Sequence, residues 1–193
     1  MTSRSLGRGA ANRWNSGVVS LLDEPHAGMV TGIWDELESK LGLREVKVAP
    51  WPHVSYQLGD YDLPLLTPIL EEVAAKANPF EIETAGLGIF TGSRPIVYVP
   101  VVRTAELSEW HRLLWAAIGT ACRNIADHYW LSDWIPHITL AMDDVHPANL
   151  GAVVEQLAAR NLSWTITIDN LSFIDAGYEG RELTTRLPFG SRA

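Results

Sequence analysis

The chain has 193 residues, 47% hydrophobic and 20% charged, a composition that is ordinary for a globular protein and allows a sizeable core. Its formal net charge of −8 argues against a broad surface that follows nucleic-acid phosphates, because such binding depends on Lys and Arg. A single cysteine, Cys122, excludes an intramolecular disulfide and a cysteine cluster for zinc.

The first residues of the sequence do not resemble a targeting signal. Residues 1–15 are rich in Gly, Ser and Asn, include Arg4, Arg8 and Arg13, and contain no apolar run, so we expect a flexible tail rather than a signal peptide. The longest strongly apolar stretch, residues 96–102, is far shorter than the roughly 20 residues that span a bilayer. These features predict a soluble cytoplasmic protein without membrane contact.

Strand and helix patterns then alternate in two similar rounds. The first round is predicted as strand, helix, strand, helix and strand, at residues 16–22, 23–41, 52–56, 62–77 and 80–85. Asp23 is placed to cap the first helix, and Gly42 lies just past its end. The second round repeats this order, at residues 96–102, 104–125, 136–141, 147–157 and 163–169. Two further strands are predicted at residues 171–174 and 182–187.

Internal duplication is the simplest account of the two rounds, with the Gly-, Thr- and Ser-rich residues 86–94 as the join. We predict an α+β fold of two lobes, at about residues 16–90 and 95–187, with a tail at residues 188–193. Each lobe is expected to be an antiparallel-rich sheet with helices on its outer face. A pseudo-two-fold axis would place the middle strands of both rounds side by side on a central cleft. Cys122, on the apolar side of its predicted helix, is expected to be a small core residue.

A tetrapeptide is repeated at the middle strand of each round. The two copies read histidine, apolar, hydroxyl, apolar, each after a proline: His53-Val54-Ser55-Tyr56 and His137-Ile138-Thr139-Leu140. Side chains of a strand alternate between faces, so the histidine and the hydroxyl share one face and the apolar pair shares the other. This predicts one active site built from two half-sites. The other histidines do not fit the pattern and are expected at loop, helix-surface or cap positions: His26, His111, His128 and His146.

These motifs resemble those of the two-histidine (2H) phosphoesterase superfamily, and within it the bacterial 2′-5′ RNA ligases, also called RNA 2′,3′-cyclic phosphodiesterases. The resemblance rests on residues 52–55 and 136–139, on the 84 residues that separate the two histidines, and on the duplicated pattern over residues 16–187. Residues 88–90 and 95–99 are similar to the crossover between lobes in that family. At the position of Ser55, threonine is the more familiar residue in the motif of that family. Serine keeps the hydroxyl, but its side-chain rotamer is less restricted than that of threonine.

The resemblance implies a duplicated two-lobe 2H phosphoesterase fold and a role for each motif residue. His53 and His137 would act as general acid and base on a phosphodiester, in an order that the sequence leaves open. Ser55 and Thr139 would bind phosphate oxygens, and neither a metal nor another cofactor would be required. Histidine suits proton transfer because it titrates near neutral pH, and hydroxyl donors stabilise charge that develops on phosphate.

Other residues are candidates for holding the rest of a substrate. Three aromatic residues are candidates for stacking on a base, with core packing as the alternative: Trp51, Trp134 and Phe90. Strand alternation turns Tyr56 away from the cleft. Four arginines are candidates for a phosphate-binding cation, with a solvated surface position as the alternative: Arg94, Arg103, Arg181 and Arg186.

We therefore expect a metal-independent phosphoesterase that opens ribose 2′,3′-cyclic phosphates, on RNA ends or small nucleotides, to 2′-phosphates. Two alternatives remain open, namely 2′-5′ RNA ligase activity and a non-catalytic nucleotide-binding module with the same pocket. A third hypothesis makes both histidines metal ligands. It is disfavoured because the sequence has no His-Glu-x-x-His motif and no dense Asp, Glu and His cluster, and because Asp143 and Asp144 are expected in a turn.

Overall fold

Three antiparallel sheets organise the part of the chain that the computed structural model describes, residues 16–177 and 180–190. The predicted tail at residues 1–15, and residues 191–193 of the predicted C-terminal tail, lie outside this described part. The architecture is α+β, as the sequence predicted. Within the described ranges, no helix is long and apolar enough to cross a membrane.

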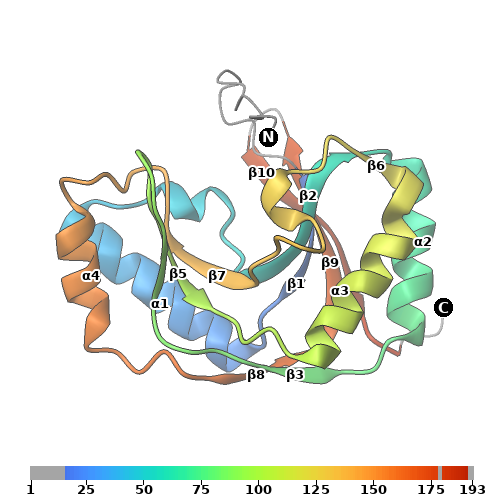
Figure 1. The fold of residues 1–193 in the computed structure, drawn as a ribbon, viewed down its shortest axis with the longest axis horizontal. Coiled ribbons are helices and arrows are strands. Elements are labelled where there is room, and N and C mark those ends of the chain that lie inside the picture. The colour runs from blue at the N-terminus through green and yellow to red at the C-terminus, as the bar shows by residue number, and fades with distance from the viewer. Residues whose placement is uncertain (1–15, 178–179, 191–193) are drawn as a thin grey trace, which may run out of the picture.

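The largest sheet carries the first motif strand. Its five strands lie in the order β10-β9-β1-β2-β6, with the bounds Gly180–Pro188, Asn170–Gly177, Ser16–Leu21, His53–Tyr61 and Cys122–Arg123. Helices α2 (Leu63–Lys76) and α3 (Ala105–Ile118) cover one face of this sheet (Figure 1). Val18, Tyr56 and Phe173 of this sheet are at most 2% exposed.

The second layer carries the second motif strand. Strands β4 (Gly88–Phe90), β5 (Ile96–Pro100) and β7 (His137–Ala141) form a three-stranded sheet in the order β4-β5-β7. Helices α1 (Glu24–Leu41) and α4 (Leu150–Ala158) pack together, and α1 also packs on β7. A two-stranded ribbon of β3 (Phe80–Glu83) and β8 (Thr165–Ile168) completes the fold. The motif strands β2 and β7 meet near the centre of the molecule (Figure 1).

The two layers differ from the two lobes that the sequence suggested, because they exchange elements. Strands β6, β9 and β10, which follow residue 95, join the sheet of β1 and β2. In each round, the helix that connects two paired strands packs on the motif strand of the other sheet. Helix α1, which connects β1 and β2, packs on β7, and α3, between β5 and β7, packs on β2. Helix and motif strand from opposite halves of the chain thereby bury each other's apolar faces, which holds the two motif strands together.

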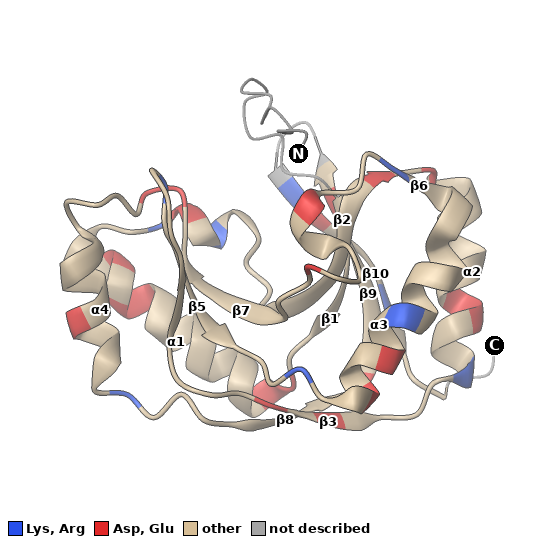
Figure 2. Cartoon of the chain, viewed as in Figure 1, with Lys and Arg blue, Asp and Glu red and all other residues tan. Residues whose placement is uncertain are grey.

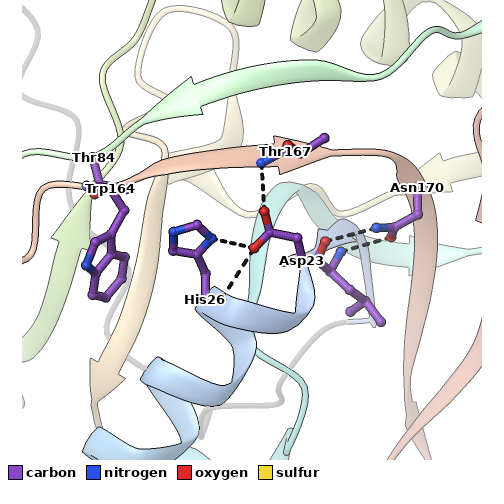
Figure 3. Close-up of polar contacts among 7 residues, drawn as sticks. Asp23, His26, Thr84, Trp164, Thr167 and Asn170 are labelled. Carbon is purple, nitrogen blue, oxygen red and sulfur yellow. Dashed lines mark hydrogen bonds and ion pairs between the residues drawn. The ribbon is translucent and has the colours of Figure 1, made fainter.

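Helix α1 begins and ends where the sequence predicted. The Asp23 carboxylate accepts a hydrogen bond from the backbone N–H of His26 at 3.4 Å, and Gly42 ends the helix in the left-handed conformation, at φ 72°. The same carboxylate accepts from the backbone N–H of Thr167 at 3.0 Å and contacts the His26 ring (Figure 3). Asp23 therefore caps α1 and also ties it to β8.

Two predicted helices have different bounds in the structure. Helix α3 starts after its predicted cap, Thr104, but ends at Ile118, because Gly119 disfavours continuation of a helix. The prediction that this helix reaches Ile125 and carries Cys122 on its apolar side was therefore wrong: Cys122 lies in β6, although it is buried as expected. Helix α4 begins at Leu150 rather than at residue 147. The described residues also form short 3-10 helices, namely η1 (Glu45–Val48), η2 (Gly119–Ala121) and η3 (Asp127–Tyr129).

Candidate active site

The four polar residues of the repeated motifs line one small cavity. His53 and Ser55 come from β2, and His137 and Thr139 come from β7, around a volume of about 70 Å³. The alternation of strand side chains holds, since the apolar residues of both motifs are 0% exposed: Val54, Tyr56, Ile138 and Leu140. Burial of these apolar residues fixes the register that turns the polar ones into the cavity.

The two histidines are oriented in the same way. Nδ1 of His53 donates to the carbonyl oxygen of Trp51 at 2.6 Å, and Nδ1 of His137 donates to the carbonyl oxygen of Ile135 at 2.7 Å. A carbonyl oxygen only accepts, so Nδ1 must carry the proton in both rings. Each ring therefore keeps Nε2 as the atom that can exchange a proton with a ligand.

Burial makes both imidazoles weaker bases than free histidine. Burial, with smaller contributions from the charges of Arg181 and His137, lowers the pKa of His53 to about 4, against a hydrogen bond to Trp51 that raises it. Burial also lowers the pKa of His137, and the nearby His128 adds to this effect. Both rings are thus neutral near pH 7. A bound phosphate anion favours protonation, because it supplies the opposite charge.

Arg181 and Tyr129 complete the polar lining of the cavity beside the first motif. Strand β7 and the adjoining part of β2 carry no charged residue (Figure 2). Among the residues that the structure describes, Arg181 of β10 is the cation that lines the cavity. Burial lowers the pKa of Arg181, but a guanidinium stays charged in proteins. Burial raises the pKa of Tyr129 to about 12, while the neighbouring Ser55 hydroxyl opposes the rise. The Tyr129 hydroxyl therefore remains a neutral donor.

Aromatic rings surround the second histidine instead. The Phe90 ring lies 5.0 Å from the His137 ring at an interplanar angle of 84°, and the Tyr98 ring lies 5.2 Å from it at 58°. Phe90 is stacked on Tyr98 at 4.2 Å. The ring of His128 is nearly parallel to Phe90, at 11°, with centroids 6.5 Å apart. Of the three aromatic candidates from the sequence, Phe90 is the one next to a motif histidine.

Trp134 supports the site from the core rather than facing a ligand. It is 1% exposed, which leaves no free ring face for a base. Its indole N–H donates to the carbonyl oxygen of Ser55 at 2.9 Å, and its ring is stacked on His111 at 3.8 Å. In the same way, the indole N–H of Trp34 in α1 donates to the carbonyl oxygen of Thr139 at 3.1 Å. A buried tryptophan therefore fixes the backbone of each hydroxyl residue.

His111 was predicted at a loop, surface or cap position, and this was wrong. It is 0% exposed in α3, where Nε2 lies 2.8 Å from the carbonyl oxygen of Tyr56 and donates to it. Burial, with a smaller contribution from the charge of Arg103, lowers the pKa of His111 to about 4. The spacing i, i+4, i+7, i+11 of Leu107, His111, Leu114 and Ile118 in α3 was the signal for this position.

Phe90 and the remaining candidates lie outside the cavity lining. The ring of Trp51 packs against Val19, Leu21 and Ile174 and lines a separate hollow with Arg186; the carbonyl of Trp51, not its ring, contacts His53. Arg94 forms an ion pair with Asp143 at 3.3 Å and is half exposed. Arg103 donates to the carbonyl oxygens of Trp134 and Leu131, at 3.0 and 2.6 Å. Neither Arg94 nor Arg103 lines the cavity.

Tyr129 is the residue of the site that the sequence reasoning missed. It lies in η3, in the segment that leads from β6 to the second motif, and its carbonyl oxygen accepts from the indole N–H of Trp115 at 3.0 Å. Nothing in the spacing of that segment marks Tyr129, because its approach to Ser55 depends on how two distant strands pair. Among residues 16–177 and 180–190, no three or more His, Cys, Asp and Glu side chains are grouped so as to hold a metal ion.

Comparisons with known proteins agree with this fold. A family model for the 2′-5′ RNA ligase superfamily matches residues 26–177. The structure of TT0787 from Thermus thermophilus is similar with a TM-score of 0.64 at 16% identity, over 93% of this chain and 100% of that one. E. coli LigT complexed with NADP+ is similar with a TM-score of 0.54 at 13% identity, over 92% and 98% of the two chains. The comparison with curated proteins gives no match.

Proposed function

Because the chain belongs to the 2′-5′ RNA ligase superfamily, we propose that it is a metal-independent phosphoesterase that opens ribose 2′,3′-cyclic phosphates to 2′-phosphates. One observation carries the proposal: two imidazoles with anchored Nδ1 atoms and two hydroxyls surround a single cavity together with one arginine. Each group matches a need of phosphodiester hydrolysis.

The proposed reaction divides the work between the two kinds of group. One histidine, neutral at Nε2, accepts a proton from the attacking water, and the other, protonated at Nε2, gives a proton to the ribose oxygen that leaves. Positioned acid and base groups contribute typically about 10²–10⁴-fold each. Ser55, Thr139 and Arg181 donate to the non-bridging oxygens, where negative charge increases in the transition state. This division requires no metal ion.

The nature of the substrate is inferred from the surroundings of the cavity. The cavity itself is small, about 70 Å³, which suits one phosphate group rather than a length of strand. Phe90, beside His137, offers a ring on which the base of the terminal nucleotide can stack. The solved structures of E. coli LigT contain NADP+ or phosphate. Together these support a nucleotide, or the terminal nucleotide of an RNA, as the ligand.

A screen of 2′,3′-cyclic mononucleotides tests the proposal. Purified protein should convert at least one of them, and the product should be the 2′-phosphate when the isomers are separated by chromatography. The reverse reaction, 2′-5′ ligation, uses the same acid and base, so RNA with a 2′,3′-cyclic end and a 5′-hydroxyl acceptor should be tested in parallel. Binding of the cyclic nucleotides without conversion would contradict the proposal and favour the nucleotide-binding module.

A further inference from the structure

Asp144 ties the end of the second motif strand to the segment that leads into the first one. Its carboxylate oxygen Oδ2 accepts hydrogen bonds from the backbone N–H groups of Arg44 at 2.6 Å and Glu45 at 2.9 Å. These two N–H groups belong to the start of η1, and Arg44 lies 100 residues before Asp144 in the chain. The side chain of Arg44 does not cap η1. Asp144 therefore supplies the cap from the other half of the chain.

The backbone around Asp144 holds its carboxylate in place. Asp143 has φ 64°, in the left-handed region that aspartate tolerates better than most residues, and this bends the chain after β7. The backbone N–H of Asp144 donates to the carbonyl oxygen of Met142 at 2.8 Å, and the Asn149 side chain donates to the carbonyl oxygen of Asp144 at 3.0 Å. The Oδ1 atom of Asp144 is buried and has no hydrogen-bond partner among the described residues. A partly buried carboxylate depends on such donors, so the two N–H groups of η1 matter to it.

The segment that Asp144 holds forms one wall of the cavity. Val46 of η1 and Ala49, which follows η1, line the cavity and are 6% and 5% exposed. η1 packs on β7, the strand that ends just before Asp144. A second tie, from Lys47 to Asp35 at 2.7 Å, joins η1 to α1 instead. Asp144 is therefore the side chain that fixes η1 relative to the second motif strand.

The same segment carries the carbonyl group that orients His53. Residues 49–52 connect η1 to His53 and include Pro50 and Pro52. Proline fixes its own φ and restricts the residue before it, so this connection is stiff. The carbonyl oxygen of Trp51, which accepts from Nδ1 of His53 at 2.6 Å, lies between the two prolines. A displacement of η1 would therefore pass to this carbonyl oxygen and to the ring that it orients.

We propose that Asp144 is a positioning residue of the active site. By holding the start of η1 against the end of β7, it fixes the Trp51 carbonyl oxygen and with it the orientation of His53. Asp144 itself lies outside the cavity lining, so it acts through the backbone and touches no substrate. Its effect on turnover rests on the proposed phosphoesterase function, whereas its effect on the His53 ring does not.

The position of the proton on the His53 ring is the direct readout. Long-range ¹H–¹⁵N correlation spectra show which ring nitrogen carries the proton, and the His53 signals are identified by their loss in His53→Ala. In the unmodified protein, His53 and His137 should both carry it on Nδ1. In Asp144→Ala, His53 should exchange between its two tautomers. His137, which is anchored on the carbonyl of Ile135, should keep its Nδ1 proton.

Turnover of a 2′,3′-cyclic mononucleotide is the second readout. Asp144→Ala should lower kcat by about 10-fold or more, since a misplacement of about 1 Å can cost about 100-fold. KM should change by less than about 3-fold, because the phosphate-binding groups stay on strands β2, β7 and β10. Asp144→Asn keeps an oxygen for the two N–H groups, although without its charge, and should restore the His53 tautomer and most of kcat.

Two other variants are matched controls. Lys47→Met removes the tie between η1 and α1 but leaves the one to β7; because surface ion pairs contribute little, the His53 tautomer and kcat should not change. Glu71→Ala removes one exposed carboxylate from α2 and controls for the change in net charge. Asp144→Ser repeats both measurements in case Asp144→Ala fails to fold, since its shorter side chain cannot replace the carboxylate at both N–H groups.

The outcomes separate the positioning role from the proposed function. An unchanged His53 tautomer in Asp144→Ala or Asp144→Ser would overturn the proposal, and would show that packing of the Trp51 ring on Val19 and Leu21 is sufficient. Loss of the fixed tautomer in both histidines, an equal loss in Lys47→Met, or no rescue by Asp144→Asn would overturn it as well. If the tautomer responds as expected but the unmodified protein converts no cyclic nucleotide, the positioning role stands and the proposed function is wrong.

Discussion

Trp134→Phe tests whether the buried tryptophans hold the motif strands in place. Phenylalanine keeps an aromatic ring against His111 but loses the indole N–H that donates to the carbonyl oxygen of Ser55 at 2.9 Å. Trp134 is 1% exposed, so water cannot replace the donor, and an unsatisfied buried acceptor costs about 1–3 kcal/mol. A loss of about 2 kcal/mol corresponds to a decrease of about 4–8 °C in Tm for a chain of this size.

The same substitution should reduce turnover. Ser55 is two residues from His53, and displacement of a catalytic group by about 1 Å can cost about 100-fold, so we expect a decrease in kcat of about 10-fold or more. Trp130→Phe is the matched control, because Trp130 is 46% exposed and should change the free energy of unfolding by less than about 0.5 kcal/mol. Urea unfolding and steady-state kinetics measure both effects. If Trp134→Phe behaves like Trp130→Phe in both assays, the role assigned to the indole hydrogen bond is wrong.

Three further predictions concern His111, Phe90 and the net charge. Burial lowers the pKa of His111 to about 4, so between pH 4 and 6.5 the unfolded chain binds a proton that the folded protein does not. The free energy of unfolding should therefore fall by up to about 2 kcal/mol from pH 7 to 5. Urea unfolding should show a smaller fall for His111→Gln. Phe90→Leu should raise KM for a cyclic nucleotide about 10-fold without changing the affinity for inorganic phosphate, and an equal loss of both would refute base stacking. With a net charge of −8, kcat/KM on a cyclic mononucleotide should rival that on a long RNA end and depend weakly on salt; a logarithmic slope of several units would instead indicate a basic track.

Local signals in the sequence predicted the elements best. Asp23 and Gly42 mark the ends of α1 because a carboxylate cap and a left-handed glycine act within a few residues. The alternation in the two motifs predicted which side chains are buried, since one face of each strand must pack on the core. The end of α3 was predicted too late because apolar spacing continued past Gly119, where the chain turns into β6.

Features that depend on pairing between distant segments did not follow from the sequence. The exchange of α1 and α3 between the layers is set by tertiary packing, and no local pattern distinguishes it from two separate lobes. The same limit applies to the surroundings of the motifs. Four arginines were equal candidates, and the pairing of β10 with β9 is what brings Arg181 to the cavity. Trp134 has the chemistry of a stacking residue, but its burial gives it a structural role.

The most direct test of the central claim is turnover of a 2′,3′-cyclic mononucleotide in the presence of EDTA by four proteins: the unmodified chain, His53→Ala, His137→Ala and the double variant. We predict turnover by the unmodified protein without added metal, and a loss of about 10²–10⁴-fold in each single variant. The double variant should be little worse than either, because the two groups act as a unit. Near-normal turnover in either single variant, or activity that EDTA abolishes and one specific metal ion restores, would contradict the two-histidine mechanism.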